Sequence, residues 1–302
     1  MQGSNLNYVL ITAARNEEVF IENTIRSVIA QTVCPQKWVI VSDGSTDRTD
    51  DIVKAYADQH NWIKLIRMPE RRDRQFAAKV QCIKAAYDTL QGLRFDVIAS
   101  LDADITFESD YMAFLLGKMA QDASVGVVGT RFIENSLQIY DYKFMNAEHV
   151  SGGCQVFRRE CFDAIGGYLP MRGGGEDWAA VTSARMKGWR TQSYTAKFFV
   201  HHRPMGTHGQ KFLGAQFCQG KRDYLTGGHP LWQIFRSVFQ MSRKPYFIGG
   251  LCLFLGYVSA FLRGIERPVP KDLMLFHRSE QMARLRNLLL CRTKNDLAKS
   301  KI

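Results

Sequence analysis

Several features that would assign a chain to a common protein class are missing from this 302-residue sequence. Its seven cysteines include no CxxC pair and no zinc-ligand spacing, so they predict reduced thiols rather than a disulfide framework or a zinc module. No basic segment followed by an apolar one opens the chain, so no secretory signal is expected. The first 240 residues contain no internal repeat or low-complexity tract. These absences predict a cytoplasmic protein, and 46% hydrophobic residues allow a sizeable core.

A deficit of acidic residues is confined to the last part of the chain. Residues 221–302 hold 15 Lys and Arg against 5 Asp and Glu, whereas residues 1–220 hold 25 against 24. The net charge of +11 therefore belongs to the C-terminal part. A nucleic-acid-binding protein of the helix-turn-helix or bZIP type is disfavoured, because the first 220 residues carry almost no net charge.

Residues 245–262 form an uncharged stretch of 18 residues, rich in Leu, Phe, Gly and Tyr. Its basic flanks are Arg243, Lys244, Arg263 and Arg267. An apolar run with basic flanks indicates a short span or an interfacial helix at an anionic, cytoplasmic membrane face. The other interpretation is a hydrophobic helix buried against the catalytic domain.

Strand-like and helix-like segments alternate over the first third of the chain. Apolar runs and helical spacing predict strands at Tyr8–Ala13, Trp38–Val41, Trp62–Arg67 and Asp96–Leu101, with helices at 19–29, 52–57 and 76–90 between them. This alternation predicts an α/β protein with a doubly wound, mostly parallel sheet flanked by helices. We expect a catalytic domain in residues 1–225 and a basic, hydrophobic, helical extension in residues 226–302.

Polar clusters follow the first, second and fourth predicted strands, at the edge where ligands bind in such sheets. They are Ala13–Glu17, Ser42–Asp47 and Asp102–Asp104. In extended geometry Asp102 and Asp104 point to the same side. Two oxygen ligands so placed suit a hard divalent cation that completes its shell with substrate phosphates. The alternative interpretation of Asp102–Asp104 is a turn with solvated carboxylates. The alternative interpretation of Ser42–Asp47 is a helix N-cap.

Basic residues near the third predicted helix are a second candidate for ligand binding. Arg74 and Lys79 form either a solvated basic face or a phosphate clamp aided by the helix N-terminus. Farther along, His201-His202-Arg203 follows the strand-like residues 198–200. A histidine there, for which we choose His202, is a candidate further metal or phosphate ligand, although a structural role is the more common one for a lone histidine.

Three consecutive glycines, residues 173–175, precede Glu176 and Asp177 at what resembles a helix start. Glycines allow the backbone to approach a ligand closely or to adopt positive φ. The two acids either favour the helix N-terminus electrostatically or place a general base beside an acceptor hydroxyl.

Taken in order, four motifs resemble the pattern of glycosyltransferase family 2 on a GT-A fold, across about residues 7–225. They are Thr12-Ala-Ala-Arg15-Asn16-Glu17, Asp43-Gly-Ser-Thr-Asp47, Asp102-Ala-Asp104 and Gly175-Glu-Asp177-Trp178. The resemblance implies a Rossmann-like, nucleotide-sugar-binding half in residues 1–105 and an acceptor-binding half in residues 106–225. It also implies an inverting transfer that uses Mg²⁺ or Mn²⁺.

The resemblance implies a role for each candidate residue. Asp177 takes the position of the base that deprotonates the acceptor, and Asp43 recognises the nucleobase, commonly uracil. The metal would be held by Asp104 and Asp102, joined by the candidate His202. The acceptor would lie against Gly174, Gly175, Glu176 and Trp178. The remaining donor-binding residues would be Thr12, Ala14, Arg15, Glu17, Ser45, Arg74, Lys79 and Ala103.

Two departures from the family pattern narrow the expected activity. The QxxRW motif of processive members is replaced by Gln219-Gly-Lys-Arg222-Asp-Tyr224, and one apolar segment is too few for a polymer channel, which predicts transfer of a single sugar. The family's glycine-rich loop is absent from residues 74–79, which leaves the sugar and the nucleotide open. We favour a UDP-sugar donor and a glycan or polyprenyl-diphosphate-linked acceptor, in cell-surface polysaccharide or glycoconjugate biosynthesis.

Two other functions remain open at this point. A nucleotidyltransferase would share the sheet and the acidic metal site, but it predicts a glycine-rich loop after the first strand, where this chain has Ala13-Ala-Arg15-Asn16. A catalytically silent scaffold or glycan-binding protein at the membrane would share the composition. Release of nucleoside diphosphate from a sugar nucleotide would separate an enzyme from such a binder.

Overall fold

The computed structural model of the chain describes residues 6–70, 77–134, 138–139, 147–171, 174–203 and 212–299. It divides into two compact units, with the first unit ending at Met205 and the second beginning at Gly206. The sequence predicted a domain boundary after residue 225. Helix α7, Phe212–Leu225, packs closely with α9, Ile248–Leu262, inside the second unit. The end of the functional catalytic domain stays a prediction.

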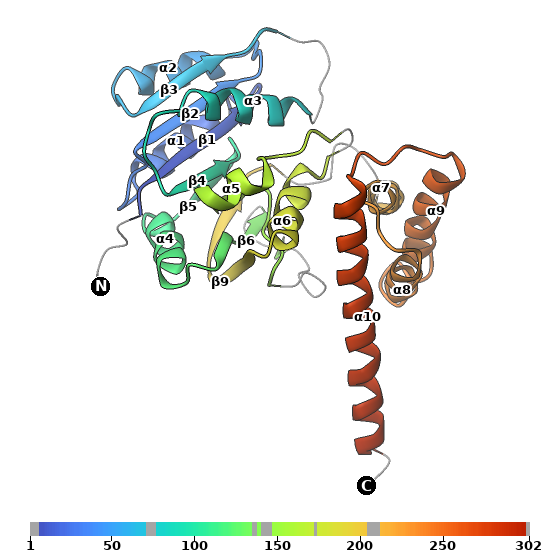
Figure 1. Ribbon diagram of the computed structural model, residues 1–302. Coiled ribbons are helices and arrows are strands. Elements are labelled where there is room, and N and C mark those ends of the chain that lie inside the picture. Colours follow the sequence, from blue (N-terminus) through green and yellow to red (C-terminus); the bar gives the residue numbers. More distant parts are fainter. Residues whose placement is uncertain are drawn as a thin grey trace. The chain divides into compact units, whose positions relative to one another are not determined.

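The first half of the first unit has the predicted alternation of strands and helices (Figure 1). Its apolar runs form buried strands, and each predicted helix begins within a few residues of the expected position. In chain order the elements are β1 Tyr8–Ala14, α1 Ile21–Ile29, β2 Lys37–Ser42, α2 Thr49–Ala57, β3 Ile63–Arg67, α3 Ala77–Asp88 and β4 Val97–Leu101. Strands β1 to β4 pair in parallel, in the order β3-β2-β1-β4.

The second half of this unit extends the same sheet with mixed pairing. Its elements are β5 Ile105–Phe107, α4 Tyr111–Gln121, β6 Val125–Glu134, β7 Gln138–Ile139, β8 Cys154–Arg158, α5 Arg159–Ile165, α6 Glu176–Met186 and β9 Arg190–His201. The order continues as β4-β8-β6-β9-β5, with β7 paired to β6. Strand β8 is antiparallel to both β4 and β6, β5 is antiparallel to β9, and β6 runs parallel to β9. The predicted α/β sheet flanked by helices is confirmed, with antiparallel pairs in this half.

Two apolar layers enclose the sheet because successive side chains of a strand point to opposite faces. In β1, Tyr8 and Leu10 pack on the side of α1, α2 and α4, whereas Val9 and Ile11 pack on the side of α3, α5 and α6. Both faces are covered, so the strands read as nearly continuous apolar runs. The carboxyl ends of the strands therefore remain as the place for ligands.

The second unit is helical and contains α7, α8 (Pro230–Met241), α9 and α10 (Lys271–Lys299). Helices α7 and α9 approach so closely that a Cβ atom on Gly220 would lie 1.9 Å from the Leu253 carbonyl oxygen, and one on Gly256 would lie 2.0 Å from that of Phe217. Over the described part of the chain, every helix is too short or too polar to cross a bilayer.

Candidate active site

Three loops meet at the carboxyl edge of the sheet, as the sequence predicted. Strand β1 lies between β2 and β4, with Ala14 beside Ser42 in register. The loops that follow these three strands contain Arg15, Asp43 and Asp102. Their side chains are thus gathered by the parallel pairing of the strands that precede them.

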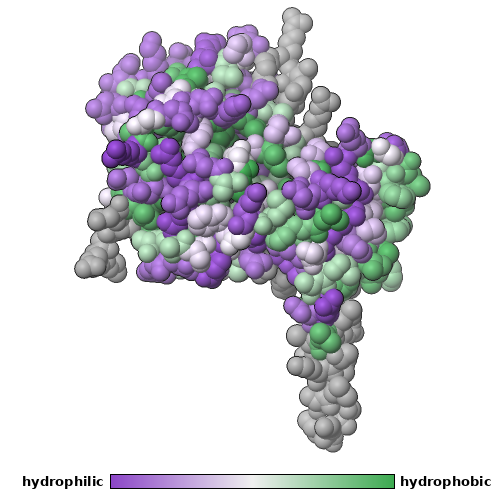
Figure 2. Space-filling model, in the orientation of Figure 1, coloured by the Kyte–Doolittle hydropathy of each residue, from purple (hydrophilic) through white to green (hydrophobic). Residues whose placement is uncertain are grey.

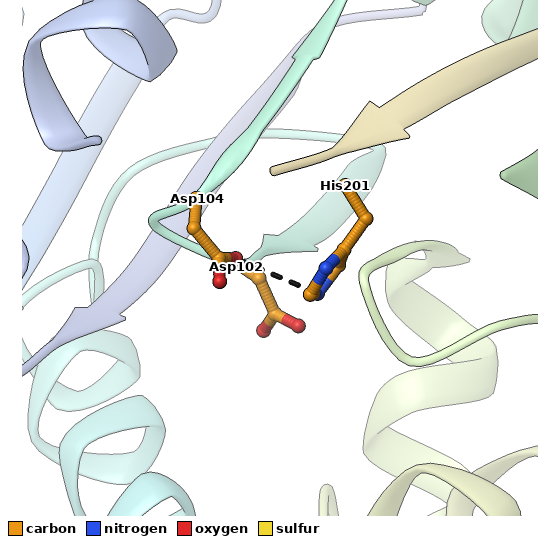
Figure 3. A group of neighbouring side chains, drawn as sticks. All are labelled: Asp102, Asp104 and His201. Atoms are coloured by element: carbon orange, nitrogen blue, oxygen red, sulfur yellow. Dashed lines mark ion pairs between the residues drawn. The ribbon is translucent and has the colours of Figure 1, made fainter. Parts of the chain in front are cut away.

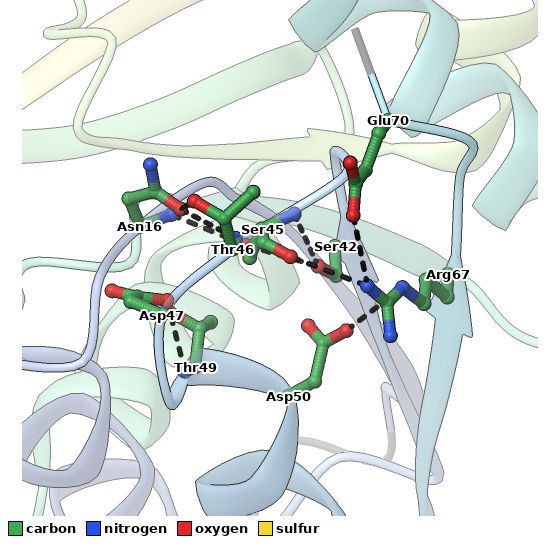
Figure 4. Close-up of polar contacts among 9 residues, drawn as sticks. All are labelled: Asn16, Ser42, Ser45, Thr46, Asp47, Thr49, Asp50, Arg67 and Glu70. Carbon is green, nitrogen blue, oxygen red and sulfur yellow. Dashed lines mark hydrogen bonds and ion pairs between the residues drawn. The ribbon is translucent and has the colours of Figure 1, made fainter.

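Hydrogen bonds connect the loops after β1 and β2 (Figure 4). The Asn16 N–H donates to Ser45 Oγ at 3.2 Å, and the Thr46 N–H donates to Asn16 Oδ1 at 2.9 Å. Arg15 Nη1 lies 3.6 Å from Asp43 Oδ2, and Asp43 is buried. These contacts hold Arg15 and Asp43 together at the carboxyl ends of β1 and β2. The resemblance places the nucleobase there.

Four predicted donor-binding residues make hydrogen bonds that support the loops of the site. Thr12 is fully buried, and its Oγ1 accepts a hydrogen bond from Trp38 Nε1 at 3.1 Å. Ser45 is buried and accepts from Ser42 Oγ at 3.0 Å. The carbonyl oxygen of Ala14 accepts from the Asp43 N–H at 2.8 Å, and that of Ala103 accepts from Thr24 Oγ1 at 2.7 Å. The structure leaves the side chains of Thr12 and Ser45 engaged with the protein.

A cluster of possible metal ligands stands directly after β4 (Figure 3). Asp102, Asp104 and His201 each offer one ligand atom, and these atoms all lie within 4.8 Å of one another. Ile105 at the start of β5 is in register with His201 at the end of β9, which brings His201 Nε2 to 3.6 Å from Asp104 Oδ1. Two carboxylates and an imidazole are a donor set suited to a divalent cation.

The histidine beside the acidic pair is His201, and not the predicted His202. The Nε2 atom of His202 lies 2.9 Å from Thr106 Oγ1, and its ring stacks on Phe20 with the centroids 6.2 Å apart. Neighbouring residues at a strand end point in opposite directions, so only one of two adjacent histidines can face the cluster. The strand register that selects between them depends on β5, which the sequence analysis did not identify.

Arg203 joins the acidic pair to the loop after β1. Its Nη2 lies 2.6 Å from Glu17 Oε2, and its Nε lies 3.8 Å from Asp104 Oδ2. Burial raises the pKa of Glu17 to about 7 although Arg203 acts to lower it. Burial and then the nearby Asp102 raise the pKa of Asp104, while His201 and Arg203 act to lower it. Burial therefore disfavours the ionised forms of Glu17 and Asp104. A bound cation would stabilise the ionised form of Asp104, which fits a metal site.

Lys79 lies inside this acidic group. Its Nζ is 2.5 Å from Asp102 Oδ1. Burial acts to lower the pKa of Lys79, but the carboxylates of Asp102 and Glu176 outweigh it and the pKa is raised. The ammonium therefore stays charged beside the predicted diphosphate site. The other predicted phosphate ligand, Arg74, lies outside the described residues.

The predicted catalytic segment begins helix α6. Gly174 and Gly175 have φ of 84° and 105°, in the left-handed region that favours glycine, and Gly175 is the N-cap. The two acids occupy the first helical turn but differ in their surroundings. Glu176 is buried, and burial raises its pKa although Lys79 opposes the shift. Asp177 is half-buried, and Trp178 beside it is half-buried as well.

Two adjacent glycines that the sequence analysis did not single out lie between the acidic pair and Asp177. The Gly153 carbonyl oxygen accepts a hydrogen bond from the Asp102 N–H at 2.9 Å. A Cβ atom on Gly152 would lie 2.5 Å from Asp177 Oδ2. The Asp177 side chain occupies the space that a side chain at position 152 would fill. The paired glycines just before the strand that contains Cys154 were the available signal, but sequence spacing alone does not place them beside Asp177.

Replacing Gly152 with alanine should displace the Asp177 carboxylate without removing it. The added methyl group would overlap Asp177 Oδ2 and force the carboxylate to move, so we expect the transfer rate to fall by about 10²-fold, in line with the loss of a positioned general base. Donor affinity should be nearly unchanged. The matched control is Gly117→Ala, because nothing lies within 4 Å of a Cβ at that helical position. Equal rates for the two variants would contradict a role for Gly152.

Comparisons with known proteins agree with this geometry. Residues 9–137 match the model of Glycosyl transferase family 2. The beta-monoglucosyldiacylglycerol synthase of Trichormus variabilis is 26% identical over 200 residues, which are 65% of this chain and 40% of that protein. The chain spans 33% to 40% of the length of the first curated relatives that it matches.

Two solved structures share the fold. The mannosyltransferase PcManGT of Pyrobaculum calidifontis, in complex with GDP-Man and Mn²⁺, matches with a TM-score of 0.57 and 18% identity over 97% of this chain and 80% of that chain. TarS 1-349 of S. aureus, in complex with UDP-GlcNAc, matches with a TM-score of 0.55 and 14% identity over 73% of this chain and 67% of that chain. The match over residues 9–137 and the fold shared with these structures agree with the expected glycosyltransferase family 2 pattern on a GT-A fold.

Proposed function

We propose that this protein is an inverting glycosyltransferase that moves a single sugar from a nucleotide-sugar donor to a hydroxyl of a glycan or lipid-linked acceptor. The observation that carries the proposal is the arrangement of Asp102, Asp104 and His201 at the edge of the sheet, with Gly152 and Gly153 between this cluster and Asp177. One side of this arrangement suits a diphosphate, and the other suits an acceptor hydroxyl. A UDP-sugar is the favoured donor.

The residues divide the reaction between leaving group and nucleophile. As the bond from the anomeric carbon to the diphosphate breaks, negative charge grows on the leaving oxygen. The Lys79 ammonium, which contacts Asp102 of the acidic pair, would stabilise that charge. The acceptor oxygen forms its bond to the anomeric carbon from the opposite face, and its proton passes to the Asp177 carboxylate. The products are the glycosylated acceptor and a nucleoside diphosphate. The anomeric carbon passes through an oxocarbenium-like state, as in glycoside hydrolysis.

Mg²⁺ or Mn²⁺ is the proposed cofactor, with Asp104, Asp102 and His201 as its protein ligands. Such an ion would supply Lewis-acid stabilisation of the departing diphosphate. Support comes from the raised pKa of Asp104 and from the close approach of the three ligand atoms. PcManGT, which shares the fold, was solved with Mn²⁺.

A lipid-linked acceptor at the cytoplasmic face of a membrane is the proposed setting. A relative that matches 65% of the chain is named for a glucosyldiacylglycerol, which is a glycolipid. The C-terminal part adds a basic and apolar composition. Synthesis of a cell-surface polysaccharide or glycoconjugate is the proposed biological role.

A panel of sugar nucleotides should reveal the donor. We expect release of nucleoside diphosphate to be fastest with a UDP-sugar, to need Mn²⁺ or Mg²⁺, and to stop in excess EDTA, because the acidic cluster would otherwise repel the diphosphate. The measurement is nucleotide release from UDP, GDP and dTDP sugars, with and without metal.

Preference for a GDP-sugar would correct the nucleotide and keep the enzyme. No release from any of these donors, under conditions where the folded protein binds them, would favour the silent binding protein.

A further inference from the structure

Helices α8 and α9 and the loop between them expose an unusual number of large apolar side chains. Phe247, next to Tyr246 in the loop, is 74% exposed, and its φ of 60° is rare for a bulky residue. We call the following exposed set the apolar face: Leu231, Ile234, Val238, Tyr246, Phe247, Ile248, Leu251 and Leu255. Figure 2 shows hydrophobic colour gathered over α8 and α9. Contiguous apolar surface of this kind marks an interaction site.

The polarity of these helices is partly inverted. In α8, Gln233 and Ser237 are each only 2% exposed, whereas Ile234 and Val238, their neighbours in sequence, are exposed. In α9 the buried side combines small residues with Leu253 and Tyr257, and Gly250 lies so close to α8 that a Cβ atom there would be 2.3 Å from the Ser237 carbonyl oxygen. A helix pair in water would bury its leucines and isoleucines and expose its polar residues. Here leucines and isoleucines are exposed instead.

Basic side chains lie next to the apolar face. Arg243, half-buried, stacks on Phe239 with its guanidinium carbon 4.7 Å from the ring centroid, and Lys244 is exposed in the same loop. Arg263, also exposed, follows the last turn of α9, and Glu266 is an exposed acid nearby. Positive charge beside apolar and aromatic side chains matches the boundary between lipid headgroups and acyl chains.

We propose that the apolar face docks onto the surface of an anionic lipid bilayer, with Tyr246, Phe247 and Ile248 entering the headgroup region. Helix α9 has 15 residues, about 22 Å at 1.5 Å per residue, which is short of the roughly 30 Å hydrocarbon core. Lying in the interface requires no such length. Anionic lipid is the partner because the adjoining charges are mostly basic.

Docking would bring the protein to a lipid-linked acceptor. Only this role of the docking rests on the proposed function. A protein that floats with vesicles need not transfer a sugar, and a glycosyltransferase with a water-soluble acceptor need not float. Flotation in the absence of donor and acceptor therefore fails or succeeds independently of the transfer reaction.

The experiment is flotation of the full chain with two kinds of vesicle. One is phosphatidylcholine alone, and the other contains about 30 mol% of the anionic lipid phosphatidylglycerol. We expect binding to the anionic vesicles that weakens as NaCl is raised. The variant Leu251→Gln with Leu255→Gln should lower the partition coefficient by about tenfold per leucine. Lys244→Glu with Arg263→Glu should lower it by about tenfold or more.

Matched controls carry the same chemistry elsewhere. Val19→Gln changes an exposed apolar residue of the first unit, and Lys64→Glu with Lys84→Glu reverses two exposed charges there. Both controls should bind like the parent. The leucine variant should melt within a few degrees of the parent, because its side chains face outward.

Each of four results would overturn the proposal. These are no flotation of the parent, equal flotation of the leucine variant, equal binding to neutral vesicles, and a large fall in the Tm of the leucine variant. A concentration-dependent dimer that the leucine variant abolishes would assign the face to a second copy of the chain instead.

Discussion

Replacing Asp104 with alanine should abolish sugar transfer while leaving the protein folded. Asp104 faces His201 and Asp102 within the only group of possible metal ligands found among the described residues. Loss of a ligand that helps to stabilise the departing diphosphate should lower kcat by about 10³-fold or more. Donor affinity should fall as well, because the donor's diphosphate would complete the metal shell.

The fold is expected to tolerate this change. A raised pKa means that the folded protein binds the Asp104 proton more tightly than the unfolded chain does, so at neutral pH the ionised carboxylate destabilises the fold. Its removal should leave the Tm unchanged or slightly higher. Arg203 keeps its contact with Glu17 at 2.6 Å.

Nucleotide release, Mn²⁺ binding and thermal melting together test the Asp104 prediction. Asp88→Ala is the control, because Asp88 is exposed at the end of α3 and lies outside the cluster. Unchanged activity of the parent protein in excess EDTA would show that no metal is needed. Full activity of Asp104→Ala would remove the cluster from the mechanism.

Asparagine at position 177 should stop transfer far more effectively than glutamine at position 176. Both substitutions keep shape and remove a carboxylate, so the comparison isolates the base. Loss of a positioned general base typically costs about 10² to 10⁴ in rate. We expect that loss in the kcat of Asp177→Asn, with nucleotide affinity nearly unchanged. Glu176→Gln should be the milder change.

The surroundings of the two acids favour this assignment. A raised pKa alone would make Glu176 an attractive base, but burial is the cause, and its carboxylate is buried near Lys79. Asp177 is half-buried, and its carboxylate lies against the backbone of Gly152. Adjacent residues on a helix diverge by about 100°, so one acceptor cannot contact both in the same way.

Transfer rates and calorimetric binding of UDP to both amide variants decide between the acids. If Glu176→Gln loses transfer while Asp177→Asn keeps it, the two roles must be exchanged. If both variants stay active, the segment is structural and the base lies elsewhere.

Much of the first half of the first unit was predictable because its signals are local. The run Tyr8–Ala14 is apolar on both faces of the sheet, and helical spacing marked α1, α2 and α3. Strand β9, by contrast, is mostly half-buried and exposed, so only its last residues gave an apolar signal. Strands β6 and β8 are largely buried and apolar, but no strand was predicted between the fourth strand and residue 198.

The candidate site shows the same division. Asp102, Asp104 and Lys79 were named from sequence, and the structure brings them together. His201 and Arg203 belong to the segment named from sequence, but His202 was chosen from it, and Gly152 was not named. Their relevance depends on partners roughly 25 to 190 positions away in the chain or on strand register. Thr12 was named for the donor, and that role stays a prediction; its side chain is buried and accepts a hydrogen bond from Trp38.

By itself the sequence determined the order of the elements, the loops that carry acidic and basic groups, and the excess of positive charge at the C-terminal end. These depend on residue type and on spacing within a few turns or one strand. The tertiary structure alone decided which of two adjacent histidines faces Asp104, that a glycine backbone borders Asp177, and that α8 and α9 turn leucines and isoleucines outward. Strand register and helix packing make those choices, because a one-residue shift reverses which side chain faces the site.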